Sequence, residues 1–406
     1  MFAGVQGGVG EGVDPLTSLR FSAEKRSECV PKPFSASREA MRTCLAHAVG
    51  LFPTFTPMNP SSFFNGLRVL DLSSVLAGPS VASFFAELGA EVIKVESPQG
   101  DVTRTWFANG ENQDSLSAYY LSVNHDKKKV VIDLKNNRSD LDAYLDKADI
   151  VIMNFKPGDD AKWQLTSAEL RAKYPHLIIA RIKGFEEDTT RVAYDVVLQA
   201  ETGFMSINGT PDSGPLKMPV AMMDVLAAHQ LKEAILCALI HRLRTGEGAS
   251  VSCSLEMAGI TGLMNQAMSY VKSGIIPERI GSLHPNICPY GETLTFADGV
   301  TVVLAVGSQS QFERLVSLLG IAELSNEIDF KDNASRVTHR VELGRRLQAA
   351  AAQCAFSPME SEWIAAHIPY GRIKNIKEVM QSPAGQLSLV PSADGLYVKS
   401  VAFNWE

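Results

Sequence analysis

Two carboxylates of this 406-residue chain stand in otherwise apolar stretches and are its best candidates for chemistry. Asp195 lies in "AYDVVLQA" and Asp224 in "VAMMDVLAAH". In such surroundings a carboxylate can act as a nucleophile or as a proton-transfer base. Asp224 opens a long apolar run that predicts a helix. Free N–H groups and the helix dipole there favour the ionised carboxylate, even though apolar neighbours raise its pKa.

A structural role suits the same two positions. An aspartate at a helix start often caps the helix by accepting a hydrogen bond from a backbone N–H group. From the residues alone, Asp224 is therefore equally well explained as a reagent and as a cap. For Asp195, a strand-end or capping role is favoured over a chemical one.

Other kinds of catalytic or metal site have weaker support in the sequence. The eight histidines show no HExxH or HxH spacing, so neither a metal site nor an obvious histidine base is indicated. No GxSxG motif surrounds a serine. The six cysteines form no CxxC pair, which argues against zinc and against a disulfide framework. We expect no metal and no permanently bound cofactor.

The elements that position these carboxylates follow an alternating pattern. Short apolar runs at 67–72, 91–96, 129–134, 149–155 and 177–182 predict strands, and helices are predicted at 79–89, 139–147 and 166–173. This alternation predicts an α/β fold with a doubly wound, mostly parallel, Rossmann-like sheet and ligands at the carboxyl ends of the strands. The first strand–helix turn, "SSVLAGPS", lacks both GxGxxG and the P-loop pattern, so a dinucleotide site is not expected.

The second half of the chain adds a smaller domain. A helix of about twenty residues after Asp224 should end at Gly246 or Gly248, followed by a strand in "ASVSCSL" and a helix at 255–271. A hairpin should turn at Asp298 and Gly299, helices should continue to about Cys354, and "LYVKSVAF" could rejoin the sheet. We expect a large domain at 58–256, a linker helix at 257–274, a small domain at 275–335 and a return segment at 336–406.

Composition predicts a soluble, cytoplasmic protein. The chain is 45% hydrophobic and 20% charged with a formal net charge of −7, which argues against a nucleic-acid partner. No apolar run reaches the roughly 18 to 20 residues that a membrane span requires. Residues 1–57 are rich in Gly, Ser and Pro, and their acidic residues do not suit a transit peptide. They are expected to be a leader that is disordered or outside the core.

Several ordered segments resemble one enzyme family. From about Asn65 the chain reads "GLRVLDLSSVLAGPSVASFFAELGAEVIKVE", "NHDKKKVVIDLK", "ADIVIMNFKPG", "PVAMMDVLAAHQ", "HPNICPYG" and "IPYGRIKNIKEV". Together these segments resemble the class III coenzyme A transferases, the CaiB/BaiF family, which includes formyl-CoA transferase and α-methylacyl-CoA racemase. The resemblance implies an enzyme that moves CoA from an acyl-CoA thioester to a free carboxylic acid, and an interlocked, ring-like homodimer.

The resemblance also assigns roles to residues. It makes Asp224 the catalytic nucleophile, which would form a mixed anhydride and then an aspartyl-CoA thioester. The racemase branch has a histidine where this chain has Tyr194, and a phenol is a poor substitute because its pKa is near 10. Transferase chemistry is therefore favoured. The alternatives are an epimerase in which Asp195 and Asp224 share proton transfer, and a CoA-binding homologue without activity.

The same family pattern implies the residues that contact CoA and substrate. They are Val75, Leu76 and Ala77 in the first turn; Ile132, Asp133, Leu134 and Lys135; Asn154, Phe155 and Lys162; Tyr194 and Asp195; and His284 and Asn286 as a substrate-facing lid. Formyl-CoA transferase has an arginine at the place of Ser97, a glutamine at Leu76 and a glycine-rich loop that this chain lacks. Oxalate and formate are therefore not the expected acids.

Overall fold

The structure is a computed structural model that describes residues 62–187, 190–392 and 395–404. Residues 58–406 form one compact unit. The leader expected at 1–57 lies outside the described residues.

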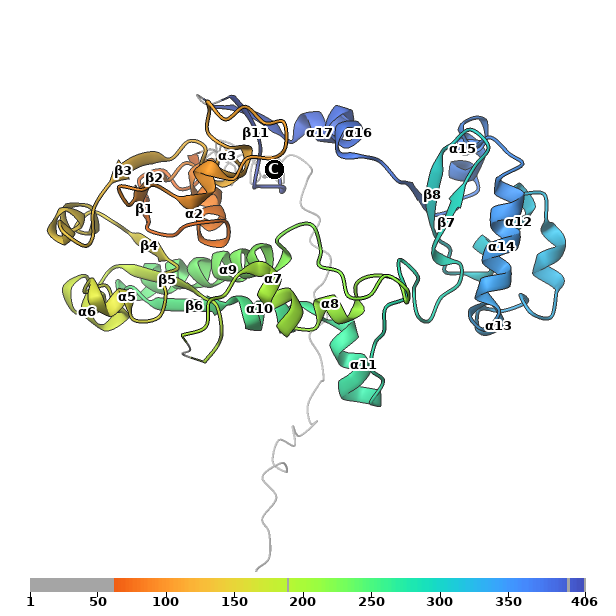
Figure 1. Ribbon diagram of the computed structural model, residues 1–406, viewed down its shortest axis with the longest axis horizontal. Coiled ribbons are helices and arrows are strands. Elements are labelled where there is room, and N and C mark those ends of the chain that lie inside the picture. The colour runs from red at the N-terminus through yellow and green to blue at the C-terminus, as the bar shows by residue number, and fades with distance from the viewer. Residues whose placement is uncertain (1–61, 188–189, 393–394, 405–406) are drawn as a thin grey trace, which may run out of the picture. The chain divides into compact units, whose positions relative to one another are not determined.

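A six-stranded parallel sheet forms the centre of the large domain (Figure 1). Its strands are β1 (Arg68–Asp71), β2 (Glu91–Glu96), β3 (Lys128–Val131), β4 (Ile150–Met153), β5 (Ile178–Lys183) and β6 (Ser250–Ser254). The order β3-β2-β1-β4-β5-β6 is that of a Rossmann sheet, in which the chain first builds outward from β1 and then crosses to β4. The carboxyl ends of β1 and β4 therefore meet at the point where the winding reverses, which is where such sheets bind ligands.

Helices cover both faces of this sheet, as the alternating sequence pattern predicts. Within β4, Ile150 and Ile152 pack into one hydrophobic core with α2 (Ala77–Glu87) and α9 (Met222–Thr245). Val151 and Met153 of the same strand pack into a second core with α4 (Asp142–Leu145) and α6 (Ser167–Lys173). Because successive strand residues point to opposite faces, a fully apolar strand such as β4 belongs between two helical layers.

The helix predicted at 255–271 is two helices in the structure. They are α10 (Leu255–Gly262) and α11 (Asn265–Ser273). Between them Met264 has φ +47°, a left-handed conformation that interrupts the helical ladder. The end of α9 agrees with the sequence: Gly246 is its C-cap with φ +79°, a conformation that glycine adopts without strain.

A third hydrophobic core is built around a small antiparallel sheet. This sheet contains β7 (Tyr290–Thr295), β8 (Thr301–Ala305) and β9 (Tyr370–Arg372), and the β7–β8 turn includes Gly299, as predicted. Helices α12 (Gln309–Leu318), α14 (Arg340–Ala351) and α15 (Phe356–Ala365) pack with it. The core extends from Cys288 to Ile368, so residue 335, the expected end of the small domain, lies inside it.

The prediction that "LYVKSVAF" rejoins the central sheet is wrong. β11 (Gly395–Val398) pairs antiparallel with β10 (Leu389–Ser392) in a separate two-stranded sheet. The N–H groups of Ser400 and Val401 then donate to the carboxylate of Glu87, at the end of α2. The segment therefore reaches the large domain through a side chain instead of through a strand edge.

Short elements complete the described chain. They are η2 (Val102–Thr105), α3 (Ala118–Asn124), η3 (Arg138–Leu141), α5 (Asp159–Lys162), α7 (Asp195–Glu201), α8 (Phe204–Ile207), η4 (Ala322–Asn326), α13 (Asn333–Thr338), α16 (Ile376–Gln381) and α17 (Pro383–Leu387). No helix among the described residues is long and apolar enough to cross a membrane.

Candidate functional site

Asp224 lies in the first turn of α9 but does not cap it. The helix begins at Met222 after the N-cap residue Ala221, and its N-cap makes no side-chain hydrogen bond. Asp224 is thus the third helical residue, and its side chain is partly buried. The capping role that the sequence left open for Asp224 is therefore not the one it has.

Asp195 is the aspartate that satisfies the start of α9. Its Oδ1 accepts a hydrogen bond from the N–H of Met223 at 2.8 Å. Its Oδ2 accepts one from Nε2 of Gln199 at 2.7 Å. Asp195 is the first residue of α7. Its carboxylate therefore reaches from α7 to the start of α9 and performs the capping role that the sequence favoured.

Gln199 fixes the segment that leads into α9. The side chain is fully buried. Its Oε1 accepts from the N–H of Met218 at 2.6 Å, and its Nε2 lies 3.3 Å from the carbonyl of Met218 and 3.4 Å from that of Val220. Since a buried amide left without partners is costly, these contacts hold one conformation of the chain immediately before Asp224.

The environment of Asp224 favours the protonated carboxyl more than the sequence suggested. Burial and, to a smaller extent, the negative charge of Asp195 raise the pKa of Asp224 to about 7. The helix start was expected to keep this carboxylate ionised. Desolvation and a second carboxylate oppose that effect because both disfavour a further negative charge. Near neutral pH the carboxyl is thus poised between its two forms.

Tyr119, in α3, is a site residue that the sequence did not reveal. Its pKa is raised to about 12, first by burial and then by the charges of three carboxylates, Asp224, Asp195 and Asp101. Its ring lies edge-on to Trp106 at 5.2 Å. A phenol that stays protonated beside Asp224 is a hydrogen-bond donor available to a substrate. The only hint in the sequence was the pair "YY" at a helix start.

The first turn after β1 is clamped to the end of β4. The N–H of Ser74 donates to Oδ1 of Asn154 at 3.0 Å, and Nδ2 of Asn154 donates to the carbonyl of Ser74 at 2.8 Å. Asn154 was expected to contact CoA. Its amide holds the turn that contains the expected CoA residues Val75, Leu76 and Ala77.

The other expected CoA residues follow the ends of β3 and β4. Ile132 is buried, Lys135 is exposed, and Asp133 and Leu134 are partly exposed. The carboxylate of Asp133 accepts from the N–H of Lys135 at 3.0 Å and so shapes the local turn. Because parallel strands end at one edge, these residues, the first turn and Asn154 share the carboxyl edge of the sheet.

Aromatic residues follow β4 along the same edge. Phe155 packs edge-on against Trp163 with ring centroids 4.9 Å apart. The ammonium of Lys162 lies 5.6 Å from the centre of the Trp163 ring. Lys162 is exposed, so its charge is accessible to an anion from solvent.

Within the described part of the chain, no hydrogen bond or ion pair joins the remaining expected residues to Asp224. Tyr194 is the exposed N-cap of α7 and makes no capping bond. His284 and Asn286 precede β7, and Nδ1 of His284 accepts from the N–H of Asn286 at 3.1 Å. Among the described residues, no hydrogen bond or ion pair links either of them to Asp224.

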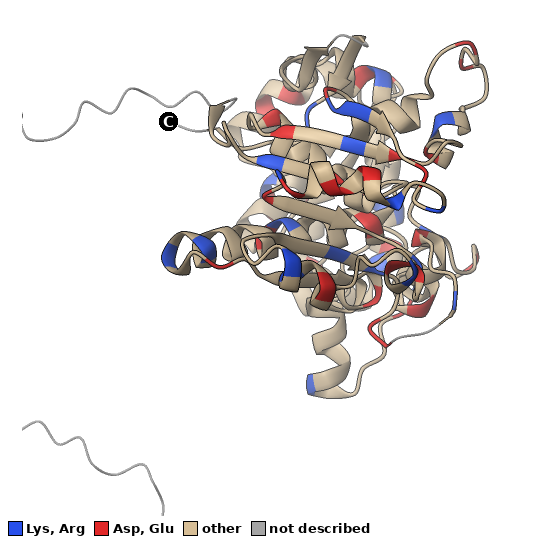
Figure 2. Ribbon diagram, turned by 90° about the vertical axis from the view of Figure 1, so that its left-hand side faces the viewer, with Lys and Arg blue, Asp and Glu red and all other residues tan. Residues whose placement is uncertain are grey.

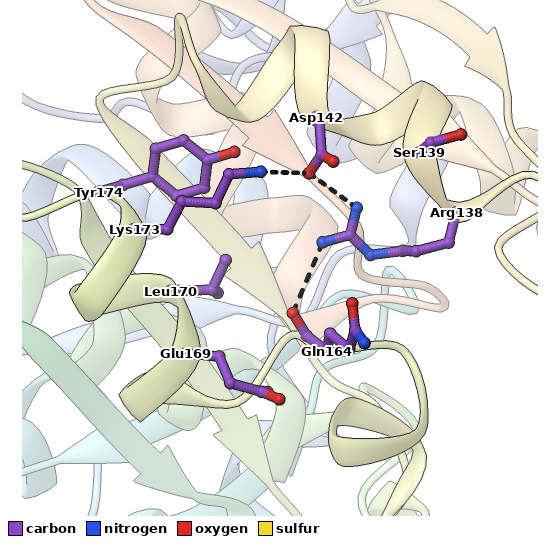
Figure 3. A pocket seen from close by; sticks show the side chains of 8 residues that line it. All are labelled: Arg138, Ser139, Asp142, Gln164, Glu169, Leu170, Lys173 and Tyr174. Atoms are coloured by element: carbon purple, nitrogen blue, oxygen red, sulfur yellow. Dashed lines mark hydrogen bonds and ion pairs between the residues drawn. The ribbon is translucent and has the colours of Figure 1, made fainter.

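A cavity of about 340 Å³ is lined by residues of η3, α4 and α6 and does not suit an anion (Figure 3). Figure 3 shows Asp142 between Arg138 and Lys173, at 3.0 and 3.2 Å. Both cations are thus already paired. Figure 2 shows Lys and Arg interspersed with Asp and Glu across the described elements. In the part of the chain described, no three His, Cys, Asp or Glu residues are grouped to hold a metal ion.

Comparison with known proteins supplies the wider context. The family model "CoA-transferase family III" matches residues 64–388. The succinate–glutarate CoA-transferase of Agrobacterium fabrum is 37% identical over 332 residues, covering 79% of this chain and 82% of that protein. The succinyl-CoA:glutarate CoA-transferase of Homo sapiens is 32% identical, covering 84% and 80%. The crystal structure of a CaiB/BaiF family protein from Brucella suis has a TM-score of 0.76 at 34% identity, covering 84% and 92%.

Proposed function

The chain belongs to CoA-transferase family III and is an acyl-CoA:carboxylate CoA-transferase, and from this premise we propose that Asp224 is its covalent nucleophile. One observation supports this assignment most. Asp224 is a partly buried carboxylate in the first turn of α9, and its neighbour Asp195, not Asp224 itself, caps the helix. Its carboxylate is free of the structural bond that an aspartate at a helix start usually makes.

The proposed reaction has two matched halves. A carboxylate oxygen of Asp224 attacks the acyl-CoA carbonyl, which releases CoA thiolate and leaves a mixed anhydride. The thiolate attacks the aspartyl carbonyl, which frees the donor acid and forms an aspartyl-CoA thioester. The acceptor carboxylate attacks this thioester, and the released thiolate then attacks the acceptor's carbonyl in the new anhydride. Acyl-CoA of the second acid forms, and Asp224 returns as a carboxylate.

Tyr119 is proposed to stabilise the negative charge that develops in these steps. Each attack places charge on a carbonyl oxygen, and a positioned donor in a water-poor site lowers the barrier to that attack. The phenol is partly buried, and its raised pKa keeps it protonated over the working pH range.

For the acids, we propose short dicarboxylates. The relatives from Agrobacterium fabrum and Homo sapiens are named for succinate or succinyl-CoA and for glutarate. The test is a panel of donors including succinyl-CoA, each combined with mono- and dicarboxylic acceptors, with the new thioester measured by liquid chromatography and mass spectrometry. We expect dicarboxylate pairs to give the highest kcat/KM, and faster turnover with monocarboxylates would overturn this assignment.

Trapping identifies the nucleophile. Acyl-CoA is incubated with the enzyme without an acceptor, hydroxylamine is added, and the modified peptide is found by mass spectrometry. We expect an aspartyl hydroxamate at Asp224. Modification at another residue would refute the role of Asp224.

We also propose that the working form is a homodimer. Apolar side chains of α11 and the following linker are exposed, and they surround a largely apolar cavity of about 250 Å³ that Tyr270, Val271 and Ile276 help to line. Contiguous exposed apolar surface of this kind marks a protein–protein interface. The interlocked, ring-like arrangement suggested by the family resemblance is the form we propose.

The epimerase alternative has less support. It requires Asp195 to exchange protons with substrate, yet both oxygens of its carboxylate already accept hydrogen bonds from Met223 and Gln199. Exchange of solvent deuterium into the α-carbon of a 2-methylacyl-CoA, in the absence of an acceptor acid, would restore this alternative.

A further inference from the structure

Four buried charged side chains lie beneath the turn between β1 and α2. They are Asp71, Lys94, Asp101 and Lys127, and each side chain is at most 1% exposed. Lys127 Nζ lies 2.9 Å from Asp71, and Lys94 Nζ lies 3.2 Å from Asp101 and 3.9 Å from Asp71. Buried ion pairs contribute little net stability compared with apolar packing, because desolvating the charges is so costly. Net stability therefore does not explain this cluster, and its hydrogen bonds to the backbone are the better guide to its role.

Each member of the cluster holds a backbone group of the turn. Lys94 donates to the carbonyl of Ser73, and Lys127 donates to the carbonyl of Pro79 at 2.8 Å. Asp71 accepts from the N–H of Ser73 at 3.0 Å. Asp101 accepts from the N–H of Val75 at 3.3 Å. The cluster is therefore a scaffold for the backbone of residues 73–79.

Val75 is the strained residue of this turn. Its φ is +72°, a left-handed conformation that is a genuine outlier for a β-branched residue. Such a conformation costs on the order of 1–3 kcal/mol and persists only where its surroundings impose it. Here the Asn154 clamp fixes Ser74, and Asp101 holds the N–H of Val75 itself.

The turn leads into a helix that packs with the helix of Asp224. Residues of α2, which follows the turn, and of α9, which carries Asp224, lie in the same hydrophobic core. Helix α2, which follows the turn, has no acidic residue in its first turn and no side-chain cap. The conformation of Val75 thus sets the direction in which the backbone passes from the end of β1 into α2.

We propose that Asp101, itself oriented by Thr103 and paired with Lys94, is a positioning residue that holds Val75 in its left-handed conformation and so shapes the turn that binds acyl-CoA. Oδ1 of Asp101 accepts from the N–H and Oγ1 of Thr103 at 3.0 and 2.8 Å, which directs Oδ2 towards Val75 and Lys94. This inference rests on the proposed function, because it takes the turn to be part of the acyl-CoA site.

The test is a double-mutant cycle between Asp101→Asn and Val75→Gly. Asn keeps an oxygen for Thr103 but loses the charge that holds Val75 and Lys94. We expect Asp101→Asn to raise KM for acyl-CoA by about tenfold or more and to change kcat by less than about threefold. Glycine adopts positive φ without strain. In the Val75→Gly background, the effect of Asp101→Asn on KM should therefore fall below about threefold.

Two further variants separate positioning from folding. Thr103→Val keeps the volume and all four cluster charges but removes one bond to Asp101, and we expect a smaller rise in KM that also disappears with Val75→Gly. Asp71→Asn perturbs the same cluster without touching Val75, and Val75→Gly should not correct it. If Asp101→Asn does not fold, as judged by circular dichroism, the Thr103→Val cycle alone decides.

The outcomes distinguish this inference from the proposed function. An unmodified enzyme that transfers no CoA between any acid pair would refute the function. An active enzyme in which Asp101→Asn or Thr103→Val lowers kcat at constant KM, or in which Val75→Gly gives no rescue, would refute the positioning role of Asp101.

Discussion

At the scale of single residues, the central finding is a division of labour between two aspartates. Asp195 bonds to Met223 and Gln199 and orders the helix start, whereas Asp224, the proposed nucleophile, does not cap the helix. Burial and, to a smaller extent, the charge of Asp195 raise the pKa of Asp224, the proposed nucleophile, to about 7. Asp195 thus fixes the start of the helix that carries Asp224 and also raises the pKa of Asp224.

Replacement of the nucleophile should abolish transfer. We expect Asp224→Asn to lower kcat by at least about a thousandfold, since every step passes through its carboxylate. Hydroxylamine trapping should also disappear. The matched control is Asp332→Asn, which retains a capping side chain at the start of α13 and should leave kcat within about twofold. Retention of most activity in Asp224→Asn would exclude covalent catalysis at this position.

The pH dependence should follow the ionisation of Asp224. Because attack requires the carboxylate, kcat/KM should fall as the pH drops through about 7. Asp195→Asn removes a negative charge that raises this pKa, so the acidic limb should move to lower pH. Rates measured from about pH 5.5 to about pH 9 for both enzymes test this. An acidic limb at the same pH in both would show that Asp195 does not tune the nucleophile.

The free energy of unfolding should change with pH in the opposite sense to kcat/KM. The folded-state pKa of Asp224, about 7, lies above the ordinary value of an aspartate, so its ionisation destabilises the fold progressively as the pH rises from about 4 to about 7. Asp224→Asn should therefore be more stable than the unmodified protein at about pH 8, by on the order of 1–3 kcal/mol, and should gain much less at about pH 5. Urea unfolding at the two pH values measures this difference, and an equal gain at both would contradict it.

At the scale of elements, the segment before α9 depends on one buried amide. Gln199→Met keeps the volume but removes the contacts with Met218, Val220 and Asp195. We expect kcat to fall by about tenfold or more, because a misplaced nucleophile loses its near-attack geometry. Gln353→Met, on the surface, is the control. Unchanged kcat in Gln199→Met would show that the segment is held by other contacts.

The elements themselves were largely predictable, and the exceptions have physical reasons. β2 was predicted with its observed bounds because the β-branched residues Val92, Ile93 and Val95 form a short run directly after the helical pattern at 79–89. The break between α10 and α11 at Met264 was missed because no local sequence pattern indicates that a methionine will adopt a positive φ. Tyr119 was missed because it joins the site through long-range packing of α3. The sequence suggested capping for Asp195, but not that it would cap α9.

At the scale of the whole molecule, the exposed apolar surface of α11 and its linker predicts an obligate assembly. Light scattering after size exclusion should give the mass of a dimer. Val271→Glu combined with Ile276→Glu places charges on exposed apolar positions and should abolish the dimer and most of the activity. Val341→Glu, at an exposed position of α14, should leave the dimer and the activity unchanged. A monomer with full activity would refute the dimer.

The contact between Glu87 and residues 400–401 bears on how the protein is made. Ser400 is 313 residues beyond Glu87 in the chain. Helix α2 therefore leaves the ribosome long before the two N–H groups that bond to Glu87. Because closing so long a loop is slow compared with local folding, α2 gains these two hydrogen bonds only after residues 400–401 have been made. The helices and strands of the large domain are therefore synthesised before the hydrogen bonds from Ser400 and Val401 to Glu87 can form.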